Sequence, residues 1–123
     1  GIIRQNRKGA SGMSSSTDYV NYILEQLSCA GLARARRMFG EYGLYLDGMF
    51  FAVICDDELF IKPTQAALAA FPELPLAPPY AGAKDYIRVE DTDDAAALCA
   101  LARLTCEALA ELPQPKRRKR NAP

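Results

Sequence analysis

The order of apolar patterns along this 123-residue chain predicts an α+β fold: a two-layer α/β sandwich with an antiparallel sheet and helices on one of its faces. Three observations support it. Apolar residues recur at helical spacing near both ends, strand-like segments fill residues 36–62, and prolines separate a short helix from further strands. The expected order is α-β-β-β-α-β-β-α. Half of the residues are apolar and 24% are charged, as is typical of a folded domain.

The first predicted helix follows the serine run of residues 14–16. Val20, Ile23, Leu24 and Leu27 recur at positions i, i+3, i+4 and i+7, which places them on one face of a helix. The helix should end near Gly31, because glycine accepts the left-handed conformation that closes many helices.

Three antiparallel strands are expected over residues 36–62. Asp47-Gly48 is a favoured two-residue hairpin turn between the apolar segments 44–46 and 49–51. Asp56-Asp57 joins 53–55 to 58–62 in the same way. The segment therefore predicts a three-stranded meander.

A short helix, further strands and a long helix should follow. Pro63 and Thr64 begin the short helix and Pro72 ends it. Residues 86–89 form a strand, with a pairing partner near Tyr80. Leu98, Leu101, Ala102, Thr105, Leu109 and Leu112 then follow the helical period in the last helix.

The middle strand of the meander is apolar on both faces, although a two-layer fold covers only one. Alternation places Phe50, Ala52 and Ile54 on one side. The other side then carries Met49, Phe51, Val53 and Cys55. We expect Met49, Phe51 and Val53 to form a protein interface, most simply between two copies of the chain.

The net charge of zero conceals an acidic body between two basic ends. Residues 13–112 hold 7 basic and 15 acidic side chains, a net charge of −8. Residues 1–12 are basic and polar and are expected to be a tag remnant, outside the functional chain. Residues 113–123 are expected to be a disordered basic tail. Its charges are Lys116, Arg117, Arg118, Lys119 and Arg120.

Direct nucleic-acid binding is the alternative function that these charges suggest. Arg34, Arg36 and Arg37 are the basic cluster of the body, and strand aromatic residues lie near them in the sequence. Basic groups beside aromatic rings suit single-stranded nucleic acid. The tail adds weak, non-specific affinity for phosphates. The acidic body opposes both contributions.

The composition excludes much of common enzyme chemistry. Without histidine there is no Ser-His or Cys-His nucleophilic pair and no His-ligated zinc site. The adjacent acids lie where a turn and a helix start are predicted, which are structural positions for carboxylates. We therefore predict no catalytic, cofactor-binding or metal-ligating residue.

The four cysteines form no CxxC pair and would permit three disulfide connectivities, between which the sequence cannot choose. We expect them instead to be buried free thiols of a cytoplasmic protein. The apolar runs are also far shorter than the roughly 18 residues that a membrane span needs. We therefore expect no membrane association.

The segment RRMFGEYGLYLDGMF at residues 36–50, continued by DDELFIK at 56–62, resembles the N-terminal domain of the TfoX/Sxy family of competence regulators. The resemblance extends over about residues 17–112, within a domain that we place at 13–112. Its motif positions are structural: Met38, Phe39, Gly40, Tyr42, Gly43, Gly48, Phe50 and Lys62. Glu41 stands where the family often has a second glycine.

The resemblance implies a sheet with helices on one side, which agrees with the fold derived from the residues. It also implies a non-enzymatic bacterial regulator that acts with a catabolite-type activator protein to switch on DNA-uptake genes. That role belongs to two-domain members, which carry a helical second domain where we expect a basic tail in this chain. We therefore expect a protein-association domain in the cytoplasm, whose partner is a second copy in a homodimer or a transcriptional regulator.

Overall fold

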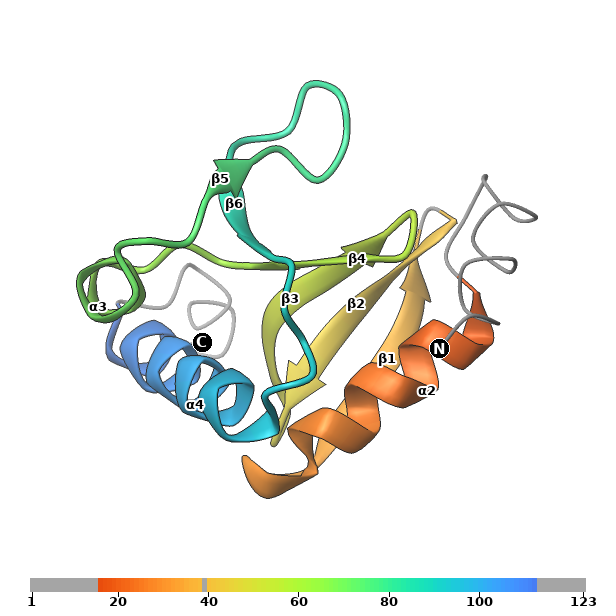
Figure 1. The fold of residues 1–123 in the computed structure, drawn as a ribbon, viewed down its shortest axis with the longest axis horizontal. Helices are drawn as coiled ribbons and strands as arrows, with labels where there is room; N and C mark the ends of the chain where they lie inside the picture. Colours follow the sequence, from red (N-terminus) through yellow and green to blue (C-terminus); the bar gives the residue numbers. More distant parts are fainter. Residues whose placement is uncertain (1–15, 39, 113–123) are drawn as a thin grey trace, which may run out of the picture.

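The computed structural model describes residues 16–38 and 40–112 and confirms the α+β class (Figure 1). The helices are α2 (Thr17–Gln26), the 3₁₀ turn η1 (Leu27–Cys29), α3 (Gln65–Ala70) and α4 (Ala95–Glu111). The strands are β1 (Ala33–Met38), β2 (Glu41–Leu46), β3 (Met49–Cys55), β4 (Glu58–Ile61), β5 (Leu76–Ala77) and β6 (Tyr86–Val89). The tag remnant proposed at 1–12 and the basic tail lie outside the described residues.

The strands form one antiparallel sheet in the order β1-β2-β3-β4-β6-β5. Both turns predicted in the meander are present. Asp47 and Gly48 have φ angles of 51° and 87°, and Asp56 and Asp57 have φ angles of 53° and 59°. Two consecutive positive φ angles match the right-handed twist of the strands that such a turn connects.

The meander has four strands, not the three that we expected. The missed strand, β1, has the sequence ARARRM and pairs with β2 over its full length. Alanine and arginine are poor strand formers and lack the β-branched or aromatic signal on which the prediction depended. The pair of later strands is confirmed, but the partner of β6 is Leu76–Ala77, and Tyr80 lies in the loop between the two strands.

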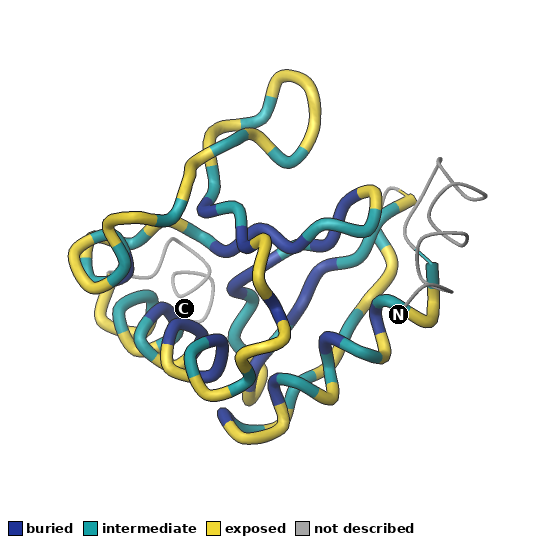
Figure 2. Tube along the Cα trace, viewed as in Figure 1, coloured by how far each residue is buried: buried dark blue, intermediate teal, exposed yellow. Residues whose placement is uncertain are grey.

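One face of the sheet, here called the covered face, packs against α2 and α4 (Figures 1 and 2). Its strand side chains are fully buried: Leu44, Ala52, Ile54, Leu59, Ile61 and Ile87. The helices contribute Ile23, Leu27, Leu101 and Ala102 to the same core. This is the apolar layer that the helical spacing predicted.

The expected division of β3 into two faces is wrong at Met49, Phe50 and Phe51. The pairing of β2 with β3 shifts between Leu44 and Tyr45, so Phe51 is an extra residue between Phe50 and Ala52. Such a bulge breaks strict alternation. Phe51 is consequently fully buried in the core with Ala52, while Phe50 lies opposite Tyr45 on the other face.

The expectation of four free thiols is also wrong. Cys29 in η1 and Cys99 in α4 form a disulfide across 70 residues, with their Cα atoms 6.1 Å apart. Cys55 and Cys106 are free. The spacing of the cysteines could not predict this pair, because the two residues meet only when the first and last helical segments pack together.

Candidate interaction site

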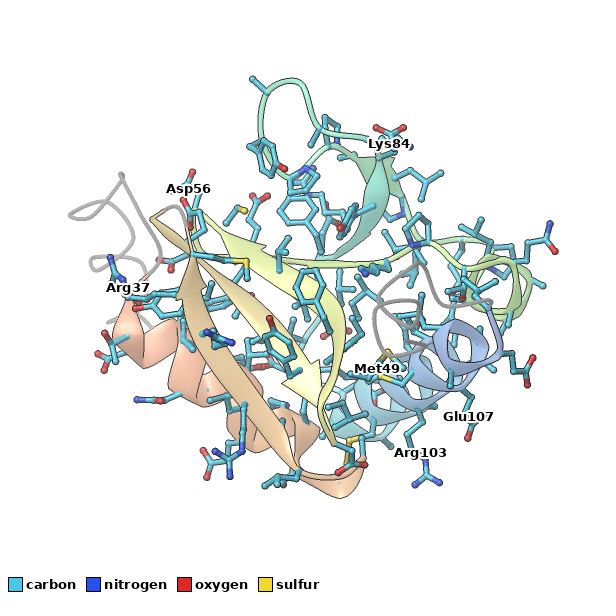
Figure 3. All side chains as sticks on the ribbon, turned by 180° about the vertical axis from the view of Figure 1, so that it is seen from behind. Arg37, Met49, Asp56, Lys84, Arg103 and Glu107 are labelled. Carbon is cyan, nitrogen blue, oxygen red and sulfur yellow. A yellow bond between two sulfur atoms is a disulfide. The ribbon has the colours of Figure 1, made fainter. Side chains whose placement is uncertain are left out.

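The face of the sheet opposite α2 and α4 is the candidate site, and we call it the open face. Figure 3 looks onto it, and none of the described helices crosses in front of β1, β2 and β3. Strand pairing places the following side chains there: Arg34, Arg36, Met38, Tyr45, Phe50, Val53, Glu58, Phe60 and Arg88.

An aromatic pair lies at the centre of the open face. The ring centroids of Tyr45 and Phe50 are 5.3 Å apart with the rings tilted by 41°. The Lys62 Nζ atom lies 4.5 Å from the centroid of the Phe50 ring, within cation–π range. Burial lowers the pKa of Lys62 from its ordinary value. These three side chains therefore pack as one unit.

Gly43 is needed because two side chains of the open face cross over it. A Cβ atom at this position would lie 2.9 Å from Met38 Cε and 3.0 Å from Phe50 Cε1. Those distances leave no room for a methyl group unless Met38 or Phe50 moves. The motif positions Met38, Gly43 and Phe50 are thus parts of one packing arrangement, which sequence spacing alone did not reveal.

The open face is partly closed by its own side chains. Phe60 is 3% exposed and Cys55 is 5% exposed, although neither belongs to the core of the covered face. Tyr45, Phe50 and Val53 are half-buried. The large apolar residues that are most exposed lie elsewhere: Leu32, Leu76, Tyr80 and Leu112.

The residues predicted as a protein interface do not share a face. Val53 lies half-buried on the open face, opposite Gly43. Met49 pairs with the core residue Leu46 and is labelled beside α4 in Figure 3. Phe51 is fully buried and has no surface to offer a partner. Of the three, only Val53 is an accessible residue of the open face.

The three arginines of β1 divide between the two sides of the sheet. Arg34 and Arg36 are exposed on the open face, where they lie opposite Tyr45 and Gly43. Arg37 lies on the other side, with its guanidinium 5.4 Å from the Tyr42 ring and donating a hydrogen bond to the Tyr42 hydroxyl at 3.3 Å. The proposed tail contacts, Lys116 to Arg120, fall outside the described residues.

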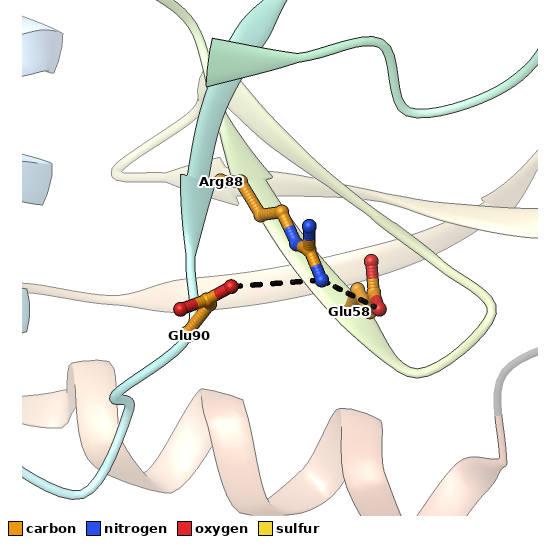
Figure 4. A network of polar contacts seen from close by, with 3 residues as sticks. All are labelled: Glu58, Arg88 and Glu90. Carbon is orange, nitrogen blue, oxygen red and sulfur yellow. Dashed lines mark hydrogen bonds and ion pairs between the residues drawn. The ribbon is translucent and has the colours of Figure 1, made fainter. Parts of the chain in front are cut away.

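A charged network borders the open face at β4 and β6 (Figure 4). The Arg88 Nη2 atom lies 3.5 Å from a carboxylate oxygen of Glu58 and 3.6 Å from one of Glu90. All three side chains are more than a third exposed, so these pairs contribute little to stability. Among the described residues, the open face therefore carries unpaired arginines along β1 and ion-paired charges along β4 and β6.

Three of the remaining motif positions, Gly40, Gly48 and Tyr42, lie within the described residues. Gly40 has a φ angle of 83° between β1 and β2, and Gly48 completes the turn between β2 and β3. Tyr42 supports Arg37. Phe39 lies outside the described residues.

The carboxylates and thiols of the described residues do not gather at one site. No group of three potential metal ligands occurs within residues 16–38 and 40–112. A hollow of about 700 Å³ lies between α3, the start of β6 and the end of α4, but its acids, Asp85 and Glu111, are exposed. Burial raises the pKa values of the Cys55 and Cys106 thiols to about 11, which leaves both protonated and weakly nucleophilic at neutral pH.

The helices of the described part of the chain are also too short or too polar to cross a membrane.

Comparison with known proteins identifies the family of this chain. Residues 25–109 match the TfoX N-terminal domain family. The chain is also 34% identical over 112 residues to an uncharacterized 12.7 kDa protein in the trpE 5' region of Spirochaeta aurantia. That alignment covers 90% of this chain and 96% of the relative. The chain therefore belongs to the TfoX N-terminal domain family.

Proposed function

We propose that this chain is a non-enzymatic regulatory domain of the bacterial cytoplasm that acts by binding another protein through the open face of its sheet. The partner is a second copy of the chain or a transcriptional regulator. The domain regulates gene expression, and more specifically the competence genes that two-domain family members control. No cofactor takes part.

The observation that carries this proposal is the half-buried aromatic centre of the open face. Tyr45, Phe50 and Val53 are held in place by packing within the chain, yet no described helix covers them. Such an ordered apolar centre surrounded by charged residues has the composition of a protein interface. Because the side chains are already fixed, binding would cost little conformational entropy.

The state of the ionisable groups supports a binding role over a catalytic one. Catalysis needs groups whose pKa values are brought towards neutrality. The pKa values of the two free thiols move in the opposite direction, to about 11. Burial lowers the pKa of Lys62, but this side chain packs over the Phe50 ring. One acid of the turn between β3 and β4 and one before α4 have structural partners: Asp57 accepts from the Ser16 N–H, and Asp94 accepts from the Ala97 N–H.

Complementation of a deletion strain tests the proposal. The gene is deleted in the native host, and the strain then expresses wild type, Val53→Asp, Tyr45→Ser or the control Leu76→Asp. Leu76 is 48% exposed on β5. Transcript levels and the frequency of DNA uptake are measured. Wild type and the control should restore both, whereas the two open-face variants should not.

Circular dichroism and thermal unfolding of each purified variant separate loss of binding from loss of folding. Unchanged transcripts in the deletion strain would refute the regulatory role. Full rescue by folded Val53→Asp and Tyr45→Ser would remove the open face from it.

Nucleic-acid binding is a second candidate, favoured by one observation. Arg34 and Arg36 lie on the same face as Tyr45 and Phe50, so cations and aromatic rings are adjacent there. Arg37 is absent from that set because its side chain lies on the opposite side of the sheet. A gel-shift titration with single-stranded DNA at rising salt tests this candidate. If this candidate is right, binding of the single-stranded DNA weakens steeply as salt rises and is lost in Arg34→Glu/Arg36→Glu.

A further inference from the structure

The two edges of the sheet are built differently. At one edge β5 has only two residues, preceded by Pro75 and followed by Pro78 and Pro79. Short length and proline, which has no N–H to donate, both prevent another strand from pairing there. At the other edge β1 has six residues and no proline, and no strand of the described chain pairs with its outer side.

The side chains of β1 indicate what kind of strand could pair with that outer edge. Arg34 and Arg36 are exposed on the open face, and neither forms an ion pair or hydrogen bond within the described residues. Ala33 and Ala35 alternate with them and lie half-buried against the core of the covered face. An added strand would place alternate side chains within about 5 Å of the two arginines. Its other side chains would lie beside small alanines.

Charge argues against two of the strands that could occupy this edge. In a second copy, β1 would bring its own three arginines against these three, and like charges on adjacent strands are destabilising. The two ends of this chain are also basic, with Arg4, Arg7 and Lys8 at one end and Lys116 to Arg120 at the other. An acidic strand has neither disadvantage.

We infer that the outer edge of β1 binds an extended acidic segment of another protein, which adds to the sheet as a further strand with acidic side chains opposite Arg34 and Arg36. Backbone hydrogen bonds supply affinity, and the alternating acids supply specificity. The inference rests on the proposed function, because both take the partner to be a protein. It concerns the outer edge of β1, whereas the proposed function concerns the aromatic centre of the open face. A nucleic-acid strand would use the arginines and leave the backbone groups of β1 without partners.

Two peptides of equal charge test this inference on the full chain with its disulfide intact. Both alternate Glu with Val over seven residues and have capped ends, and one carries N-methyl groups on the alternate amides that would donate to β1. The methylated peptide cannot form the backbone hydrogen bonds that these amides would donate to β1, so it should bind at least about tenfold more weakly. Equal binding of the two peptides would reduce the contact to charge alone and overturn the inference.

Protein variants locate the bound peptide. Arg34→Glu/Arg36→Glu should lose it, whereas the control Arg103→Glu, with one exposed arginine of α4 reversed, should retain it. A variant with the five tail charges changed to Gln should also bind normally, and loss of binding there would assign the peptide to the tail. Displacement of the peptide by oligothymidylate at lower concentration would assign the arginines to nucleic acid. Either result overturns the inference.

The peptide test and the complementation test fail separately. Val53→Asp should bind the acidic peptide normally even though it is expected to lose regulatory activity. If the peptide does not bind but open-face variants still abolish regulation, the edge is not the binding site and the proposed function stands. If the peptide binds as described but the deletion leaves transcripts unchanged, the edge is confirmed and the regulatory role is wrong.

Discussion

The two faces of this sheet are stabilised in different ways. On the covered face, strand and helix side chains bury one another completely, as Leu44, Ile54 and Leu101 illustrate. On the open face, order comes from a few contacts within the sheet, in which Met38 and Phe50 cross over Gly43 and Lys62 lies over Phe50. The covered face should therefore determine stability, while the open face is free to serve binding.

Adjacent residues of β3 provide the strongest test of this contrast. Ile54 is fully buried on the covered face, and Val53 is half-buried on the open face. Ile54→Ala should lower the free energy of unfolding by about 2–5 kcal/mol, because it removes methyl groups from a closed core. Val53→Ala should lower it by less than about 1 kcal/mol. Urea unfolding of both variants measures the difference, and equal losses would show that the open face is as closed as the core.

The disulfide should be the next largest contribution, because it joins the two helical segments that cover the sheet. Cys29 and Cys99 close a loop of 70 residues. A bridge of this kind contributes about 2–4 kcal/mol, largely by restricting the unfolded chain. Cys29→Ser/Cys99→Ser should lose that amount, and a reducing agent should have the same effect on wild type.

A thiol count gives an independent check of this pairing. Denatured, unreduced protein should present two reactive thiols, those of Cys55 and Cys106, and reduction should raise the number to four. Four thiols before reduction would mean that the bridge is absent in the isolated protein.

The crowded glycine of the open face should have a smaller effect. Gly43→Ala places a methyl group against Met38 Cε and Phe50 Cε1, and overpacking of this kind costs about 1–3 kcal/mol. Met38→Ala in the same chain removes one of the two obstacles. The double variant should therefore be more stable than the sum of the two single losses predicts. Strict additivity in urea unfolding would show that Met38 does not pack over Gly43.

Sequence patterns predicted the covered face better than the open face. Helical spacing identified Ile23, Leu27 and Leu101 as core residues, because burial imposes a period that the sequence displays directly. Two features of the sheet were missed for physical reasons. The strand β1 lacks apolar alternation, since alanines form its inner side, and the bulge at Phe51 reversed the faces assigned to Met49, Phe50 and Phe51. The candidate site lies where these features meet, so the sequence placed Val53 on the face where the structure has it and placed Met49 and Phe51 there wrongly.

The smallest effect that we expect is a loss of folding stability at alkaline pH, caused by the two free thiols. Cys55 lies on the open side of the sheet, and Cys106 lies on α4, on the covered side. Burial is the main cause that raises the pKa values of Cys55 and Cys106 to about 11, assisted at Cys55 by Glu41 and Asp56 and at Cys106 by Asp47 and Glu107. In the unfolded chain these thiols ionise at lower pH, so between about pH 9 and 11 the folded state binds more protons than the unfolded state. Stability should therefore fall as pH rises through this window.

Cys55→Ala and Cys106→Ala should each remove part of that fall, which urea unfolding at pH 7, 9 and 10.5 would measure. Tyr19 is retained in every variant and also has a raised pKa, so some decline should persist when both cysteines are replaced. If Cys55→Ala leaves the pH dependence unchanged, its thiol is exposed to water in solution. The open face around Cys55 would then be more accessible to water than the 5% exposed fraction of Cys55 indicates.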